Sequence, residues 1–379
     1  MFIRRTVALT LLISCMLTGA SAQSQTRKEV AIPDIPGYHT LKCDFHIHSV
    51  FSDGLVWPSV RVDEAWREGL DAIAITEHIE LRNDEVLGDH NRAWEIARAR
   101  AQRYGLICIH GTEITRSMPP GHFNALFIED ANAADTSDFL AAVEAMVKQG
   151  AFILHNHPGW RGQQPDGVSR WYPVHQTLLE RGWLHGLEVV NEREYYPAVQ
   201  RWCAEKTLTV MGNSDIHQPI HMFFDIANGD HRPMTLVFAA ERTESALRDA
   251  LFARRTAVWH QDFLIGEAQW LAPLYANMTK LTPLQSTLKG TGRASLALSN
   301  SSDLPLHLKA AGEHAEVIGP VEITVPPHRT VRIHLRGKND VAPGRRTVIL
   351  PYVVENFRIA SDSGLPVTLE AELIFVPVE

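Results

Sequence analysis

Cysteine is scarce in this sequence, and its placement excludes a disulfide framework. The 379 residues include 4 cysteines, of which Cys15 lies in an apolar N-terminal stretch. The other three lie inside apolar runs at irregular spacing, and an odd number of thiols does not fit a paired pattern. Because side chains alternate faces along a strand, Cys43 should face away from Asp44 and pack against a helix. We expect three buried thiols that are neither ligands nor nucleophiles: Cys43, Cys108 and Cys203.

Positive charge is also in short supply. The chain has 36 Lys and Arg against 44 Asp and Glu, a formal net charge of −8. A chain with this balance is not expected to bind nucleic acid nonspecifically or to bind an anionic membrane surface. The balance still leaves room for a local basic pocket that takes a small anion.

Long apolar runs are absent after the N-terminus, so the sequence predicts no membrane span. The N-terminus combines Arg4 and Arg5, a short apolar run from Val7 to Leu17, and the small residues Ala20-Ser21-Ala22. This order is typical of a secretory signal. We therefore expect a signal peptide at residues 1–22 and a secreted or periplasmic protein.

An alternative processing site lies within the apolar run. Leu12-Ile13-Ser14-Cys15 resembles a lipoprotein cleavage box and would leave Cys15 lipidated. The apolar run continues past this point and an A-x-A site follows it. We therefore favour cleavage before Gln23.

The central part of the chain has an α/β pattern. Residues 23–37 are polar and interrupted by proline, and we expect them to form a linker. Over residues 38–282, short apolar runs alternate with helix-like segments, which predicts a mostly parallel sheet covered by helices. The expected strands are 41–46, 72–76, 106–110, 123–128, 151–155, 187–190, 209–211 and 235–238, and the expected helices are 58–68, 92–104, 138–149, 197–206 and 244–252.

The pattern changes in residues 283–379. Apolar residues alternate with polar ones in runs separated by Gly, Pro and Asn-Asp turns, at 321–325, 331–335, 348–352 and 367–373. This alternation predicts a second, all-β domain of the sandwich type. The role of this domain is open, with three alternatives: covering a barrel edge, supporting a homo-oligomer, or contacting substrate.

Histidines and carboxylates end most of the expected strands, which is where β/α barrels place their active sites. Imidazole and carboxylate without clustered thiolate suit divalent ions such as Zn, Mn or Fe. These groups exceed what one ion needs, so the sequence predicts a multinuclear hydrolytic site. The groups are Asp44, His46, His48, Asp53, Glu77, His78, Glu113, His122, His155, His157, Asp215 and His217.

The first cluster shares one strand face. His46 and His48 are placed to bind one ion, and Asp44 is expected to accept a hydrogen bond that fixes a histidine tautomer. Asp53 lies in a Ser-Asp-Gly turn, where aspartate is common for conformational reasons alone. Beside the two histidines we interpret Asp53 as a ligand.

The later clusters contain further candidate ligands. His78 and Glu113 each follow a strand, and a glutamate is able to bridge two ions, whereas Glu77 is left outside the ligand set. Of the pair His155 and His157, the second is favoured because it lies nearest the turn at Pro158-Gly159. The remaining members are His122, Asp215 and His217, while His221 is interpreted as a loop residue that is exposed to solvent.

The motifs in this order resemble the PHP (polymerase and histidinol phosphatase) superfamily. They are Asp-x-His-x-His-Ser, Ser-Asp-Gly, Thr-Glu-His in place of the usual Thr-Asp-His, Gly-x-Glu, His, His-Pro and Ser-Asp-x-His, between about Tyr38 and Leu274. The resemblance implies a distorted (β/α)7 barrel with two or three divalent metal ions. It implies His46, His48, Glu113 and Asp215 for the first ion, Asp53, His78 and His217 for the second, and Glu113, His122 and His157 for the third.

The leader and the C-terminal β domain look like the secreted Sb-PDE-like phosphodiesterases of the superfamily. The resemblance implies hydrolysis of small organophosphate diesters by a hydroxide that bridges two ions. Asp215 or His217 would move its proton, and at least one of Arg116 and Arg161, which lie on rim loops, would contact a phosphoryl oxygen. A small-molecule phosphate ester, and no nucleic acid, is the expected partner.

Two rival functions are weighed against this prediction. The same metal site would also hydrolyse a carbamate or carboxylic ester, and a missing anion clamp would favour that activity. The second rival is a non-catalytic metal-binding or carbohydrate-binding surface protein in which the β domain does the binding, and the complete ligand set argues against it.

Overall fold

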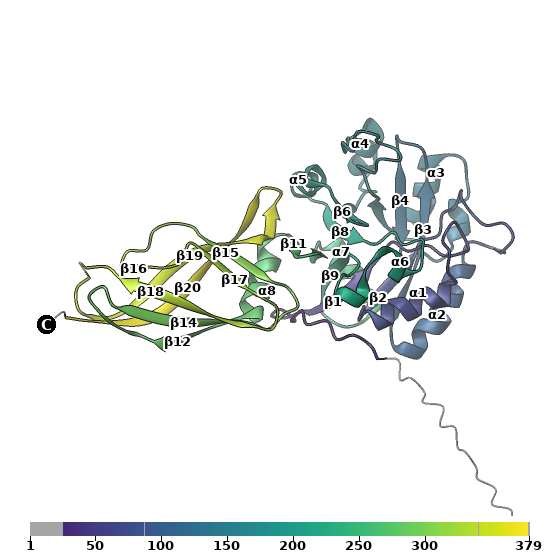
Figure 1. The fold of residues 1–379 in the computed structure, drawn as a ribbon. Coiled ribbons are helices and arrows are strands. Elements are labelled where there is room, and N and C mark those ends of the chain that lie inside the picture. The colour runs from purple at the N-terminus through teal and green to yellow at the C-terminus, as the bar shows by residue number, and fades with distance from the viewer. Residues whose placement is uncertain (1–25, 87, 340, 378–379) are drawn as a thin grey trace, which may run out of the picture.

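The computed structural model describes residues 26–86, 88–339 and 341–377 (Figure 1). The signal peptide expected at residues 1–22, including Cys15, lies outside the described residues. Within them, no helix is both long and apolar enough to cross a bilayer. Figure 1 shows the chain as an α/β part, coloured purple to green, followed by an all-β part, coloured green to yellow.

The α/β part is built from two sets of parallel strands. The first set is β1 (His39–Asp44), β2 (Ala72–Ile75) and β3 (Ile107–Thr115), and the second is β5 (Phe152–His155), β6 (Gly186–Asn191) and β8 (Thr209–Asn213). β4 (His122–Leu126) lies between β3 and β5 and is antiparallel to both. The expectation of a mostly parallel sheet is therefore wrong at β4, because the short connection from β3 reverses the chain and leaves no room for a crossover helix.

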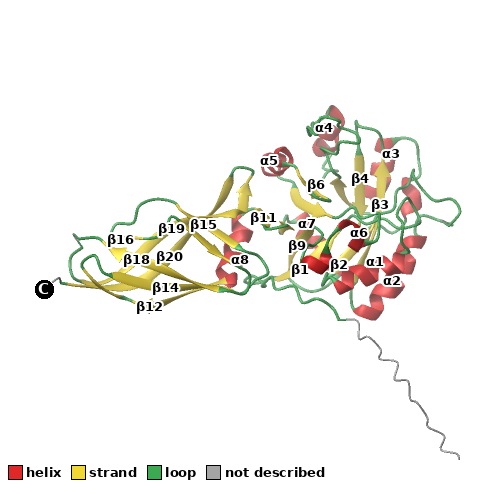
Figure 2. Cartoon of the chain, in the orientation of Figure 1, coloured by secondary structure: helices red, strands yellow, loops and turns green. Residues whose placement is uncertain are grey.

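Helices flank the barrel strands in Figure 2. Proline occupies the first turn of α1, α4 and α5, where a missing N–H costs no helical hydrogen bond. Asp138 caps α3 by accepting the Ala141 N–H at 2.9 Å. The helices are α1 (Pro58–Arg67), α2 (Arg92–Tyr104), α3 (Phe139–Lys148), α4 (Pro173–Glu180), α5 (Pro197–Lys206), α6 (Ile220–Phe223) and α7 (Glu244–Phe252), with 3-10 turns at Ala131–Ala134 and Ile226–Asn228.

Side-chain hydroxyls link the last parallel strand to the antiparallel strands that complete the barrel. β9 (Met234–Ala239) pairs antiparallel with β1 and with β10 (Thr256–His260), which pairs with β11 (Phe263–Gly266). Thr235 Oγ1 accepts the Gly212 N–H and donates to the Gly212 carbonyl, both at 2.9 Å. Thr256 Oγ1 donates to the Val210 carbonyl at 2.8 Å. These contacts join β8 to β9 and β10 and give the barrel its distorted form.

The C-terminal domain is a two-sheet β structure that follows α8 (Ala268–Met278). One sheet has the order β12-β14-β18-β16, and the other contains β13, β20 and β19 with β15 and β17 at its side. β12 begins at Thr279, before residue 283, where the sequence predicts the domain to start. The strands are β12 (Thr279–Gln285), β13 (Thr287–Lys289), β14 (Arg293–Asn300), β15 (Leu306–Ala310), β16 (Val317–Ile318), β17 (Glu322–Val325), β18 (Thr330–Gly337), β19 (Gly344–Ala360) and β20 (Ser363–Val376).

The two domains are joined by strand pairing as well as by the chain. β11 of the barrel pairs parallel with β19, with Leu264 opposite Phe357 and Ile265 opposite Arg358. The side chain of Asn356 donates to the carbonyl of Asp262 at 2.6 Å. The barrel and the C-terminal domain therefore share a hydrogen-bonded boundary.

The expected burial of the three thiols is confirmed. Cys43, Cys108 and Cys203 are free and buried. Cys43 packs in one apolar cluster with Leu247 and Leu251 of α7, on the side of β1 that faces a helix. Burial raises the pKa of the Cys43 thiol well above its usual value, which makes the reactive thiolate unfavourable.

Candidate metal centre

The residues that follow β1 and β8 meet at the carboxyl end of the barrel. His46 and His48 leave β1 with fully buried side chains, and their Nε2 atoms lie 3.1 Å from Asp215 Oδ1. Asp215 has a positive φ of 51°, a conformation that directs the chain sharply out of β8. The two strands are brought into register here by an isolated bridge between Ile47 and Ile216.

Glu113 lies at the centre of the candidate site. It extends from β3, its side chain is fully buried, and its two oxygens face different histidines. Oε2 lies 3.0 Å from His46 Nε2, 3.2 Å from His48 Nε2 and 3.2 Å from His78 Nδ1. Oε1 lies 2.7 Å from His122 Nδ1. The carboxylate is therefore placed to bridge two ions.

A second group lies beside Glu113 and opens to solvent. His217 Nε2 and His78 Nε2 lie 3.2 Å and 3.5 Å from Asp53 Oδ1. The side chain of Asp53 is 44% exposed and that of His217 is 24% exposed, whereas the Glu113 side chain is 0% exposed. The candidate site is thus reached from the side of Asp53 and His217.

His157 completes the ring from the carboxyl end of β5. Its Nε2 lies 3.7 Å from Asp215 Oδ2 and 4.0 Å from Glu113 Oε1. Its φ of +28° turns the chain directly after the strand. His155 is buried elsewhere, with its ring stacked on Phe123 at 4.6 Å, and it is not part of any ligand-like group of the described residues.

The nine predicted ligands form four overlapping groups of the kind that hold a metal ion. Within each group the ligand atoms lie within 4.8 Å of one another. His48 also lies with the residues predicted for the second ion, and His78 lies with those predicted for the third. The groups are His48, Asp53, His78 and His217; His46, His48 and Glu113; His46, His157 and Asp215; and His78, Glu113 and His122.

The chemistry of these atoms fits divalent ions. Several buried polar atoms that face the centre have no hydrogen-bond partner among the described residues, a state that is costly unless an ion or water binds them: His48 Nε2, Glu113 Oε1, His122 Nδ1 and Asp215 Oδ1. Nitrogen and oxygen atoms about 3 Å apart match two ligands that each lie about 2.1 Å from a shared ion. The residues therefore fit a multinuclear metal site.

Outer hydrogen bonds orient the imidazoles. Glu188 Oε1 accepts from His46 Nδ1 at 2.9 Å, and its Oε2 accepts the backbone N–H of His157 at 2.8 Å. The Asp215 carbonyl accepts from His217 Nδ1 at 2.7 Å. In His46 and His217 the opposite ring nitrogen, Nε2, is left free to face the centre, as is usual for histidines that bind metals.

The role expected for Asp44 is wrong, and Glu188 takes it. Asp44 lies deeper in the barrel, where its carboxylate accepts the Ser214 N–H at 3.0 Å and pairs with the buried guanidinium of Arg232 at 2.9 Å. Glu188 lies between Leu187 and Val189 on a strand whose six residues are all buried. An acidic residue within such an apolar run is the feature of the sequence from which Glu188 could have been identified.

Glu77, which the sequence leaves outside the ligand set, also serves the loop that follows β1. It accepts the Ser49 N–H at 3.1 Å and the hydroxyls of Ser49 and Ser52. Ser52 in turn lies 3.4 Å from His48 Nδ1. Glu77 thereby supports His48 indirectly.

The electrostatics keep the carboxylates ionised. Burial opposes ionisation of Glu113 and Asp215, but the surrounding histidines hold the pKa of both well below the usual range. Burial likewise opposes the charge of Asp53, yet His217 and His78 lower its pKa to about 2. Burial lowers the pKa of His78 and of His157 to about 4, so both offer a neutral nitrogen at neutral pH.

The two predicted substrate arginines differ in their surroundings. Arg116 pairs with Glu80 and donates to the Thr136 carbonyl, so its guanidinium is held against neighbouring loops. Arg161 is exposed, and within the described residues it has no hydrogen-bond or ion-pair partner. Trp160 beside it lies 5.3 Å from the His157 ring and is 42% exposed. The geometry favours Arg161 over Arg116 as a group that contacts substrate.

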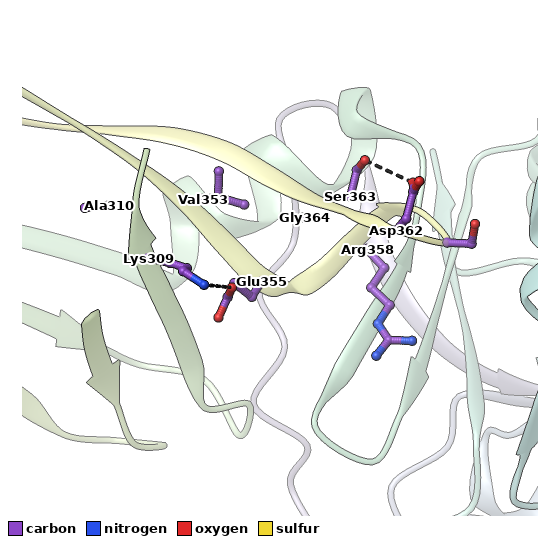
Figure 3. Close-up of a pocket in the computed structure, with 9 residues that line it drawn as sticks. Lys309, Ala310, Val353, Glu355, Arg358, Asp362, Ser363 and Gly364 are labelled. Carbon is purple, nitrogen blue, oxygen red and sulfur yellow. Dashed lines mark hydrogen bonds and ion pairs between the residues drawn. The ribbon is translucent and has the colours of Figure 1, made fainter. Parts of the chain in front are cut away.

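A hollow in the C-terminal domain was considered as an alternative site. It has a volume of about 380 Å³ and lies between β15 and the β19–β20 hairpin (Figure 3). Lys309 pairs there with Glu355 at 3.5 Å, and Arg358 extends toward the barrel to lie 3.9 Å from the Phe263 ring. No ligand-like group of the described residues includes these side chains. The barrel centre is therefore the stronger candidate.

One family model and several solved structures match parts of this chain. An Ig-like domain family matches residues 280–370. No curated protein matches the chain. Two solved structures match with TM-scores of 0.38 and 0.36: a candidate metal-dependent phosphoesterase of Bifidobacterium adolescentis (18% identity, 46% of this chain and 87% of that one) and an amidohydrolase of Chromobacterium violaceum (16% identity, 47% and 88%).

A further solved structure matches nearly the whole chain. It is a two-domain protein of Bacteroides vulgatus that contains a predicted PHP-like metal-dependent phosphoesterase. The two chains are 43% identical, with a TM-score of 0.87 over 92% of this chain and 100% of the other. By this likeness, and by the candidate metal centre at the end of its distorted barrel, the chain belongs to the PHP-like metal-dependent phosphoesterases.

Proposed function

We propose that this protein is an exported phosphodiesterase that hydrolyses small organophosphate diesters. The nine candidate ligands form four overlapping groups, two of which include Glu113, and this arrangement is the observation that carries the proposal. Divalent ions bound there, of Zn, Mn or Fe type and two or three in number, would activate water and neutralise the phosphoryl oxygens. The partial exposure of Asp53 and His217 gives an ester access to the centre from solvent.

Proton transfer is assigned to the exposed side of the centre. His217 is partly exposed, and its Nδ1 donates to the Asp215 carbonyl, so Nε2 faces Asp53 and is the atom that would hold an ion. An imidazole held at both nitrogens has no proton to give, so we assign the proton of the leaving oxygen to solvent water at this exposed side. Asp215 is more deeply buried, and its ionised carboxylate holds the imidazoles of His46 and His48 in place.

Arg161 is assigned to the anionic part of the substrate. It follows Trp160 and His157 on the loop after β5, and its guanidinium is available for a bidentate contact with two phosphoryl oxygens.

Exposed apolar side chains on the segments that follow the strands of the site favour esters with apolar groups. Leu55 donates its backbone N–H to the His217 carbonyl at 2.7 Å, yet its side chain is 65% exposed. Met222, which follows His217, is 69% exposed. Large exposed apolar residues on segments that follow the strands of the site are Leu55, Trp57, Val60, Leu81, Trp160, Val168 and Met222.

The test is an assay of protein lacking residues 1–22 after its metal content has been measured. We expect at least two ions per chain and turnover of bis(p-nitrophenyl) phosphate that exceeds turnover of p-nitrophenyl phosphate. A Glu113→Gln/His217→Asn variant should lose both ions and turnover. Absence of metal and of turnover in the unmodified protein would overturn the proposal.

A second candidate, a carbamate or carboxylic ester hydrolase, is favoured by one observation. Because Arg116 is held by Glu80, only one of the two predicted arginines is available to clamp an anion. A p-nitrophenyl carboxylic ester assayed beside the phosphate esters separates the two. Ester turnover without phosphate turnover, at full metal content, would select the second candidate.

A further inference from the structure

One sheet of the C-terminal domain differs in charge from the rest of the molecule. The sheet β12-β14-β18-β16 contains no Asp or Glu in any of its four strands, although the whole chain has a net charge of −8. The same strands contain Lys280, Arg293, Arg332 and Arg336, with His334 between the last two. The sheet is thus a basic element of an acidic protein.

The register places these cations on one face. Arg293 lies opposite Arg336, and Arg332 lies opposite Ala297 of the central strand, which in turn lies opposite Thr282. On β18 the burial alternates, with Val331, Ile333 and Leu335 turned toward the core. The positions on the side of this sheet away from the core are named the basic face. Ser295 and Ala297 at its middle are buried, and the others are Lys280, Thr282, Arg293, Ser299, Thr330, Arg332, His334 and Arg336.

The cations of the basic face are not neutralised by the protein. Lys280, Arg293, Arg332 and Arg336 are all exposed, and none forms an ion pair within the described residues. Arginines two residues apart on one side of a strand recur at about 7 Å, so Arg332 and Arg336 span about 14 Å. Their charges are therefore arranged as a row along β18.

The residues around this row of charges form a hollow beside β18. The central strand contributes only small side chains to the middle of the face, the buried Ser295 and Ala297 and the partly exposed Ser299. β16 pairs only with Arg336 and Gly337, so the rest of β18 has an open edge. A hollow of about 650 Å³ lies along this edge, lined by Arg293, Arg332, His334 and Arg336, together with Ile318 and with Glu322 of β17.

We infer that the basic face binds an anionic polysaccharide, one that carries carboxylate or sulfate groups along an extended chain. A row of unpaired cations beside small and hydroxyl-bearing side chains matches repeated anions and the hydroxyls of sugars. A narrow chain meets only this face, whereas a flat anionic membrane also meets the acidic remainder of the molecule within about 10 Å. The four strands contain no Phe, Tyr or Trp, so the stacking surfaces used for single-stranded nucleic acid are missing.

Binding of dextran sulfate and of polygalacturonate to the full chain tests the inference, with neutral dextran as the comparison polymer. We expect both anionic polymers to bind, with an affinity that falls as salt rises, and neutral dextran not to bind. Arg332→Glu/Arg336→Glu should weaken binding at least about tenfold. Lys309→Glu/Arg345→Glu, which makes the same change in charge on the other sheet, should change it less than about twofold.

The competing ligands are assayed under the same conditions. Tighter binding of a single-stranded oligonucleotide, or binding of phosphatidylglycerol vesicles without binding of the anionic polymers, would overturn the inference. So would equal loss in the two double variants. Because both substituted pairs are exposed, circular dichroism and the thermal midpoint should stay unchanged. Phosphodiester turnover is measured separately and is expected to be unaffected by either double variant.

Discussion

At the residue scale the centre depends on one carboxylate. Glu113 faces His46, His48 and His78 with one oxygen and His122 with the other. In Glu113→Gln the amide nitrogen is not a ligand, so one bridging contact is lost and bound metal should fall by at least one ion per chain. We expect kcat to drop about 10²–10³-fold, the range for removal of one electrostatic stabiliser. Metal analysis and steady-state kinetics check this, and Glu95→Gln, an exposed change on α2, should retain both properties.

The two predicted arginines give a paired test at the same scale. Arg161→Ala removes an unpaired, exposed guanidinium and should lower kcat/KM for diesters about 10–100-fold, chiefly through KM, since the lost contact is to substrate. Arg116→Ala removes the partner of Glu80 and should lower the free energy of unfolding by about 1 kcal/mol with a smaller effect on kcat/KM. Urea unfolding and kinetics of both variants distinguish the roles. A larger loss of kcat/KM in Arg116→Ala than in Arg161→Ala would instead assign the substrate contact to Arg116.

Single residues also show where sequence reasoning stops. Ligands such as His46, Glu113 and Asp215 could be found because polar groups that end apolar strands have few structural uses there. Asp44 and Glu188 were not separable in the same way, because both are acids on inward strand faces. Only the packing of the barrel shows that Asp44 pairs with Arg232 and that Glu188 contacts His46.

At the scale of elements, the long amphipathic helices were predictable and the strand order was not. The predicted bounds of α2, α5 and α7 coincide with the observed ones, since each has regular apolar spacing and a clear start or stop. α4 and α8 were missed: the eight residues of α4 give too few turns for a period to show, and Pro273 lies inside α8, where proline argues against a helix. The reversal at β4 depends on a short loop, which local propensity does not encode.

The stability of the neighbouring strands β5 and β6 is predicted to depend on pH through His185. His185 precedes β6, and its Nδ1 accepts the Ile153 N–H of β5 at 2.9 Å. Burial lowers its pKa to about 4. The unfolded chain then binds the proton more readily, so the contribution of His185 is full above about pH 6.5 and is lost as pH falls toward 4.

The expected loss is about 1–2 kcal/mol, because the side chain is only partly buried. His185→Asn keeps an acceptor in place of Nδ1 without a titrating ring, and its unfolding free energy should vary less between pH 7.5 and 4.5. Urea unfolding at the two pH values measures the difference. An unchanged pH dependence in His185→Asn would assign the acid sensitivity to other groups.

At the scale of the whole molecule the question is whether the two domains unfold together. The β11–β19 pairing continues the barrel sheet into the C-terminal domain. Asn356, which is 3% exposed, donates to the carbonyls of Asp262 at 2.6 Å and Pro305 at 2.8 Å, and so fastens the β10–β11 turn to the second domain. Asn356→Ala leaves these partly buried carbonyls without their donor, at a cost of about 1 kcal/mol for each lost bond.

Tryptophan fluorescence makes this coupling measurable, because all 9 tryptophans lie at or before Trp270 and none lies in the C-terminal domain. If the shared sheet makes the domains one cooperative unit, Asn356→Ala should shift the tryptophan-detected urea transition to lower denaturant by the full stability loss. Far-ultraviolet circular dichroism, which also detects the C-terminal strands, should shift by the same amount. Glu355→Ala, an exposed change beside it, should leave both transitions in place. A shift in circular dichroism alone would mean that the domains unfold separately and that the barrel holds its metal centre without support from the second domain.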